Sequence, residues 1–203
     1  MRKSLASVAV VVATLASALL PATAAAGASL TVEDATGDTW MTDYGDGTTA
    51  PKDVSAGSQV NVDLEKTLIR YAHGKVTVKA TFVDLRKSTN RFVLGLRLRT
   101  NEGVKRLAAV ETIERETWAG DHHLARFDGD ELSCRGLAHE IDYAADTVEL
   151  VVPASCLSKP RWVQATIGVD GYAATAGQPF MTHDNGVNDG WQHGGWTARV
   201  RQG

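Results

Sequence analysis

Strict alternation of apolar and polar side chains runs through several stretches of this chain and restricts its fold more than any other feature. From Lys75 to Val83, one face would carry Val76, Val78, Ala80 and Phe82. Because successive side chains of a β-strand point to opposite faces of a sheet, such a stretch predicts a strand with one buried face. The same period occurs in Arg91–Arg99, Thr147–Val152, Val163–Val169 and Trp196–Arg201.

Shorter segments predict further strands at Leu30–Val32, Leu68–Tyr71, Leu124–Phe127, Glu131–Cys134 and His139–Tyr143. The stretch Val104–Trp118 fits either a strand pair or a short helix. No long segment has a helical period, and Gly, Asp, Asn and Pro between the strands are typical of turns. We therefore predict an all-β fold, an antiparallel two-sheet sandwich of the jelly-roll or Ig-like kind, as a single domain over residues 29–203.

The first 28 residues have the order of a secretory signal peptide. Arg2 and Lys3 precede an apolar stretch from Leu5 to Leu20, which Pro21 and a run of small residues follow. This order predicts export, with cleavage near Ala28. The alternative is a membrane anchor, although the apolar stretch is only about as long as a minimal span. No other segment is apolar enough to cross a bilayer.

The two cysteines, Cys134 and Cys156, both follow the predicted leader. An exported chain meets an oxidising environment, where such a pair can persist as a disulfide. The alternative is two free thiols. We expect the disulfide, because neither cysteine has a C-x-x-C partner or a neighbouring histidine.

Charge argues against nucleic acid as a partner. The formal net charge is −3 for the whole chain, and removing the leader makes the remainder more acidic. Nucleic-acid binding needs clustered Lys and Arg, and no basic stripe is present.

Four aspartates form the densest acidic segment: Asp34, Asp38, Asp43 and Asp46. Glycines lie among them, and calcium prefers several oxygen ligands on a flexible loop. The spacing does not match an EF-hand. The segment is therefore a candidate Ca²⁺ site, and the alternative is an ordinary turn-rich loop.

Aromatic side chains suggest a binding surface. Trp162 and Trp196 fall in strand patterns, which predicts a place in the core. Polar or glycine-flanked stretches contain the candidate ligand-binding residues Trp40, Tyr44, Trp118 and Trp191. Exposed rings can stack on sugars, and the alternative is that these rings close the ends of the sandwich.

The segment 183–193 contains His183, Asp184, Asp189 and His193. A metal site or an acid/base pair is conceivable there, but the spacing fits no zinc motif, and a polar surface loop is the simpler interpretation. The chain also lacks a G-x-S-x-G or S-x-x-K nucleophile motif. We assign no catalytic residue.

Two segments carry a resemblance: Leu30-Thr31-Val32-Glu33-Asp34-Ala35-Thr36-Gly37-Asp38, and Val151-Val152-Pro153-Ala154-Ser155-Cys156-Leu157 with Pro160-Arg161-Trp162-Val163. They resemble short secreted bacterial β-sandwich proteins of unknown function. The opening is also similar to DOMON-like and carbohydrate-binding β-sandwich modules. That resemblance implies a fold more than a ligand, since a fold hosts many functions.

The function expected from these observations is a secreted, non-catalytic binding module for carbohydrate or another envelope component, with Ca²⁺ as a candidate stabilising ion. One alternative is a secreted hydrolase that uses the segment 183–193. The other is a structural protein whose partner is another protein.

Overall fold

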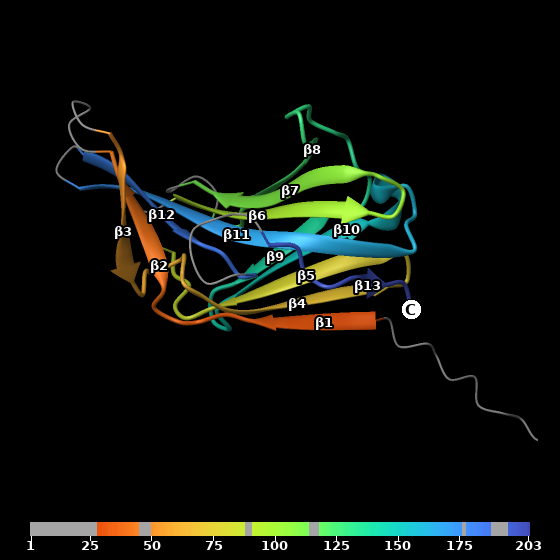
Figure 1. Cartoon of the computed structure of the whole chain (residues 1–203), viewed down its shortest axis with the longest axis horizontal. Helices are drawn as coiled ribbons and strands as arrows, with labels where there is room; N and C mark the ends of the chain where they lie inside the picture. The colour runs from red at the N-terminus through yellow and green to blue at the C-terminus, as the bar shows by residue number, and fades with distance from the viewer. Residues whose placement is uncertain (1–27, 45–49, 88–90, 114–117, 176–177, 188–194) are drawn as a thin grey trace, which may run out of the picture.

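The computed structural model describes residues 28–44, 50–87, 91–113, 118–175, 178–187 and 195–203. Two antiparallel sheets pack face to face (Figure 1). The five-stranded sheet has the order β1 (Ala28–Glu33), β4 (Leu64–Ala72), β5 (Lys75–Phe82), β10 (Thr147–Pro153) and β9 (Ala138–Asp142). The eight-stranded sheet has the order β3 (Lys52–Gly57), β2 (Thr39–Asp43), β12 (Gln178–Asp184), β11 (Trp162–Thr175), β6 (Arg91–Thr100), β7 (Lys105–Thr112) and β8 (Asp121–Arg126), with β13 (Val200–Arg201) paired to β11. This confirms the predicted antiparallel sandwich.

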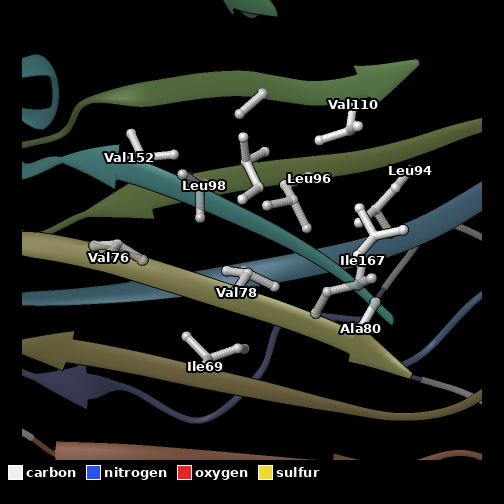
Figure 2. Packing of buried hydrophobic residues seen from close by; sticks show 14 of the residues in the cluster. Ile69, Val76, Val78, Ala80, Leu94, Leu96, Leu98, Val110, Val152 and Ile167 are labelled. Atoms are coloured by element: carbon white, nitrogen blue, oxygen red, sulfur yellow. The ribbon is translucent and has the colours of Figure 1, made fainter. Parts of the chain in front are cut away.

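The core lies between the two sheets and contains the side chains that the alternation placed on one face. Figure 2 shows Val76 and Val78 of β5 opposite Leu96 and Leu98 of β6, with Ile167 of β11 among them. All five are at most 1% exposed. Burying side chains of this size stabilises the fold by roughly 1.5–3 kcal/mol each, so the inner faces are the main source of stability.

Most predicted strands are confirmed, and the ambiguous stretch Val104–Trp118 contains strand β7 rather than a helix. The prediction of a strand over Glu131–Cys134 is wrong. Only Glu131 forms a bridge, to Ala125, and Leu132 donates its N–H to the Leu124 carbonyl. The chain turns back beside β8 and makes isolated backbone hydrogen bonds with it, without forming a β-ladder.

The last predicted strand, Trp196–Arg201, is shorter in the structure. Only Val200 and Arg201 form β13, and Thr197 rather than Ala198 is buried. Thr197 exchanges hydrogen bonds with Ala165: its N–H donates to the Ala165 carbonyl, and its hydroxyl accepts the Ala165 N–H. This pairing turns Thr197 inward and removes Ala198 from the core.

The two tryptophans predicted to lie in the core are half-buried instead. Trp162 lies under the guanidinium of Arg199 at 4.5 Å, and Trp196 lies under that of Arg99 at 4.4 Å. Arginine stacks on indole faces at the boundary with water. The guanidinium covers one face of each ring, so each ring is shielded from water without lying in the core.

The disulfide joins Cys134 to Cys156, as predicted. Cys134 precedes strand β9, and Cys156 lies in the short 3-10 helix Ala154–Leu157 that follows β10. The bond therefore ties both ends of the β9–β10 hairpin at the edge of the five-stranded sheet. In the hairpin turn, the Asp142 carboxylate accepts the N–H groups of Ala144 and Ala145.

Within the described ranges, which begin at residue 28, no helix is long and apolar enough to cross a membrane.

We expect reduction of the Cys134–Cys156 bond to destabilise the protein. The bond spans 22 residues, and closing a loop of this length contributes about 3 kcal/mol in the chain-entropy model. For a chain of this size that corresponds to a loss of roughly 6–12 °C in melting temperature. Thermal melts with and without reductant measure the effect. The double variant Cys134→Ser/Cys156→Ser is the control and should not respond to reductant, and an unchanged wild-type melt would contradict the prediction.

Candidate functional site

The outer face of the eight-stranded sheet contains a trough whose floor lacks large side chains. Gly95 of β6 lies between Gly168 of β11 and Ala109 of β7 in the strand register. Their neighbours Leu94 and Leu96 point into the core, so these small residues face outward. The three positions together leave a hollow of about 240 Å³ over the middle of the sheet.

Polar and long side chains form the walls of the trough. Arg97 and Thr166 lie on one side of the small-residue row, together with Leu107, and Asp170 lies on the other. A carboxylate accepts hydrogen bonds and a guanidinium donates them in a fixed fork. The trough therefore presents complementary donors and acceptors around an open floor.

Aromatic rings lie at both ends of this face. At one end, Tyr172 of β11 is 39% exposed, and the guanidinium of Arg91 lies 5.0 Å from its ring centre. At the other, Phe127 is 41% exposed, and the guanidinium of Arg97 lies 6.0 Å from its ring centre. Arg91 to Arg99 spans eight residue steps along β6, or about 26 Å. This length suits a chain-like ligand rather than a single small molecule.

Charges surround the Tyr172 end. Burial raises the pKa of the Tyr172 phenol above its ordinary value, and the carboxylate of Asp170 adds to the rise, while Arg91 opposes it. Arg91 also pairs with Glu111 on β7. Tyr172 is neutral at pH 7, as an ordinary tyrosine is, and its side chain is partly exposed at the surface.

The predicted ligand-binding aromatics are dispersed over the molecule. Trp40 lies on β2 and pairs in register with His183, and Tyr44 follows β2 close enough to Tyr172 to affect its pKa. Trp118 lies beside the opposite edge of the sheet, where its carbonyl accepts the Tyr143 hydroxyl at 2.9 Å. Trp191 lies outside the described residues. Of the three described residues, Tyr44 lies near the Tyr172 end of the trough, and Trp40 lies two strands from the trough residue Asp170, with His183 between them.

A second polar cluster lies where the chain crosses from one sheet to the other. Asp34 follows β1, Asp38 precedes β2, and Asp184 ends β12. Their carboxylate oxygens all lie within 4.8 Å of one another. Two oxygens bound to one Ca²⁺ at 2.3–2.6 Å can be about 5 Å apart at most, so this spacing fits a shared calcium ion.

Backbone contacts hold this acidic cluster in place. Asp184 is 4% exposed, and its carboxylate accepts the N–H groups of Leu64 and Asn185, each at 2.7 Å. Asp63 accepts the Gly37 N–H with both of its carboxylate oxygens. Gly37 has φ +79°, a conformation that glycine adopts without strain. Asp63 thereby fixes the turn that carries Asp38.

The cluster includes two of the four aspartates that the sequence suggested for calcium. Asp43 is exposed at the end of β2, opposite Lys52, and is not one of the three grouped carboxylates. Asp46 lies outside the described residues. Asp184 takes their place, and no local sequence signal connects it to Asp34, because the two are 150 positions apart.

The acid/base hypothesis for segment 183–193 gains no geometric support. His183 and Asp184 are adjacent in β12, so their side chains point to opposite faces of the sheet. His183 lies beside Asp170 and Trp40 in the strand register, whereas Asp184 faces the interior. Asp189 and His193 lie outside the described residues.

The chain matches no protein-family model, and comparisons with curated proteins and with solved structures find no match.

The buried Asp184 predicts an unusual pH dependence of stability in calcium-free buffer. Burial raises the pKa of this carboxyl from 3.8 to about 7, and the nearby Asp38 charge adds to the rise. Between these values the folded chain binds one proton more than the unfolded chain, so this group makes the free energy of unfolding fall as pH rises. Its contribution from pH 5 to pH 8 is a loss of at most about 3 kcal/mol.

Urea unfolding in chelator at pH 5, 6, 7 and 8 measures this slope. The variant Asp38→Asn should flatten it, because one of the charges that raise the Asp184 pKa is removed. Asp43→Asn is the matched control, since that residue is exposed and outside the cluster. Equal slopes in wild type and Asp38→Asn would contradict the prediction.

Proposed function

We propose that this protein is an exported, non-catalytic binding module whose trough on the eight-stranded sheet binds an oligosaccharide of the cell envelope or surroundings. The observation that carries the proposal is the small-residue floor of Gly95, Gly168 and Ala109 between two arginine-stacked aromatic ends. The disulfide and the leader-like first 28 residues support export.

The chemistry of the trough suits a sugar chain. The rings of Tyr172 and Phe127 offer apolar faces for the C–H faces of pyranose rings, and the Tyr172 hydroxyl adds a polar contact. Asp170 and Arg97 line the walls between them and can exchange hydrogen bonds with sugar hydroxyl groups. A ligand recognised in this way needs neither a nucleophile nor a redox group.

Gly95 offers a direct test, because its Cβ position is open. A Cβ there would lie 3.7 Å from the Gly168 carbonyl oxygen, which is ordinary contact. The variant Gly95→Val should therefore fold, and a β-branched residue suits a strand better than glycine does. Its side chain would rise from the floor and fill the trough. We expect unchanged or higher thermal stability and at least about a tenfold loss of sugar binding, equivalent to ~1.4 kcal/mol.

Affinity electrophoresis in β-glucan, xylan and mannan gels, and pull-down on insoluble cellulose, chitin and peptidoglycan, measure binding. Thr77→Val on β5 of the other sheet is the matched control and should bind as wild type does. Asp170→Asn should weaken binding without changing the fold. Retention of wild type on none of these glycans would refute the carbohydrate proposal, and full binding by Gly95→Val would exclude the trough as the site.

We further propose that Ca²⁺ bound by Asp34, Asp38 and Asp184 stabilises the module. The ion would neutralise carboxylates that otherwise repel one another at the crossing between sheets. It would thereby hold β12, which lies next to the trough strand β11 in the sheet, and β2, which lies on the other side of β12.

Thermal melts with Ca²⁺ and with chelator test this second proposal. An ion at 100 times its dissociation constant adds about 2.7 kcal/mol to the native state, or roughly 5–10 °C for a chain of this length. Asp38→Asn should abolish the rise, whereas Asp43→Asn should keep it. A wild-type melt that is the same with Ca²⁺ and with chelator would sink the calcium site and leave the trough proposal unaffected.

A further inference from the structure

Two histidines from different sheets meet at one open edge of the sandwich. His122 lies on the edge strand β8, and His139 lies on the edge strand β9 of the other sheet. The register pairs His122 with Val110 and His139 with Leu150, both core residues, so each histidine points toward the opposite sheet. Their Nδ1 atoms are 2.7 Å apart, and their ring centres are 4.9 Å apart.

Hydrogen bonding fixes which nitrogen of His139 carries its proton. Nε2 of His139 lies 2.7 Å from the carbonyl oxygen of Ala119, which can only accept. The Nε2 of the ring must therefore carry the hydrogen, and Nδ1 presents its lone pair to His122. Metal-binding histidines are commonly held in this way, with the second nitrogen donating to a backbone carbonyl.

The backbone before β8 leaves the space that His139 occupies. Gly120 has φ +77°, and a Cβ there would lie 3.1 Å from His139 Nε2 and 2.8 Å from Ile141 Cδ1. A larger residue would displace the imidazole. The turn thus presents the Ala119 carbonyl to the ring at a position where only glycine fits without strain.

We propose that His122 and His139 form a bidentate site for a divalent first-row transition ion, which joins β8 of one sheet to β9 of the other. Imidazole nitrogen is a favoured ligand for Cu²⁺, Ni²⁺ and Zn²⁺, and affinity should be highest for Cu²⁺. This site is separate from the trough and from the acidic cluster, and it involves none of their residues.

The geometry requires only a small adjustment. Two nitrogens about 2.0–2.1 Å from one ion are ~3.1 Å apart at an angle of about 100° at the metal. The present separation is 2.7 Å, so the two nitrogens must move apart by about 0.4 Å, and each ring must turn its lone pair by about 40° from the N–N line toward the ion. The proton between the rings would pass through solvent to Nε2 of the exposed His122, and both imidazoles would stay neutral. Water would complete the coordination of the ion.

The adjacent His123 provides a matched control. It lies on the opposite face of β8, in register with Ala109, and its Nδ1 is 3.2 Å from a carboxylate oxygen of Glu131. It differs from His122 by one position, and both are exposed. Removing either side chain should therefore perturb the fold to a similar, small extent.

Isothermal titration of the chelator-treated, tag-free protein with CuCl₂ and ZnCl₂ at pH 7.5 tests the site. We expect one equivalent of Cu²⁺ to bind more tightly than Zn²⁺ and to raise the melting temperature. His122→Ala and His139→Ala should each weaken Cu²⁺ binding by at least about tenfold, and His123→Ala should bind as wild type does. The electron paramagnetic resonance spectrum of the Cu²⁺ form should show two equatorial imidazole nitrogens, reduced to one in His122→Ala.

Unchanged Cu²⁺ affinity in His122→Ala would overturn the proposal, and so would a loss of binding in His123→Ala alone. A wild-type protein that binds neither ion would overturn the metal site and leave the pair with a structural role only, as a hydrogen bond between the two sheets. Because His122 is exposed, a folded His122→Ala protein keeps the test decisive even if His139→Ala does not fold.

Discussion

Close packing of two inner sheet faces is the constraint on which the rest of the structure depends. Leu96, Ile167 and Val78 are buried because every second residue of their strands faces the opposite sheet. The remaining positions of the same strands then face water and are free of the packing requirement. Gly95 and Gly168 occupy two such positions side by side, so the trough exists because the inner face already supplies the stability that large outer side chains would otherwise add.

In the acidic cluster, unlike in the apolar core, burial of a side chain lowers stability. Asp184 lies at the inner end of β12, where burial disfavours its charged form. Hydrogen bonds from Leu64 and Asn185 offset part of that cost. The nearby Asp34 and Asp38 add like charge, which favours either a retained proton or a bound cation. Three carboxylates so close together, one of them buried, lower the stability of the fold when all are charged. The cluster lies at the crossing from β1 to β2, where the chain passes from one sheet to the other.

The trough, the acidic cluster and the histidine pair lie in three different parts of the sandwich. The trough occupies the outer face of the larger sheet, the acidic cluster occupies the crossing near β12, and the His122–His139 pair occupies the opposite edge at β8 and β9. The disulfide lies near this last edge, since Cys134 and Cys156 flank the β9–β10 hairpin. The edge strands β8 and β9 are thus joined by a hydrogen bond between side chains as well as by apolar packing.

The sequence by itself determined the strands whose residues alternate, such as β5, β6 and β10, and it indicated the disulfide, because alternation and cysteine count are local properties of the chain. Strands β2, β3 and β12 escaped prediction, since segments such as Thr39–Asp43 show little contrast between their two faces. Only the tertiary structure brought Asp184 to Asp34, Gly95 to Gly168 and His122 to His139. Each of these contacts depends on strand order and register, which long-range packing sets and a local pattern does not encode.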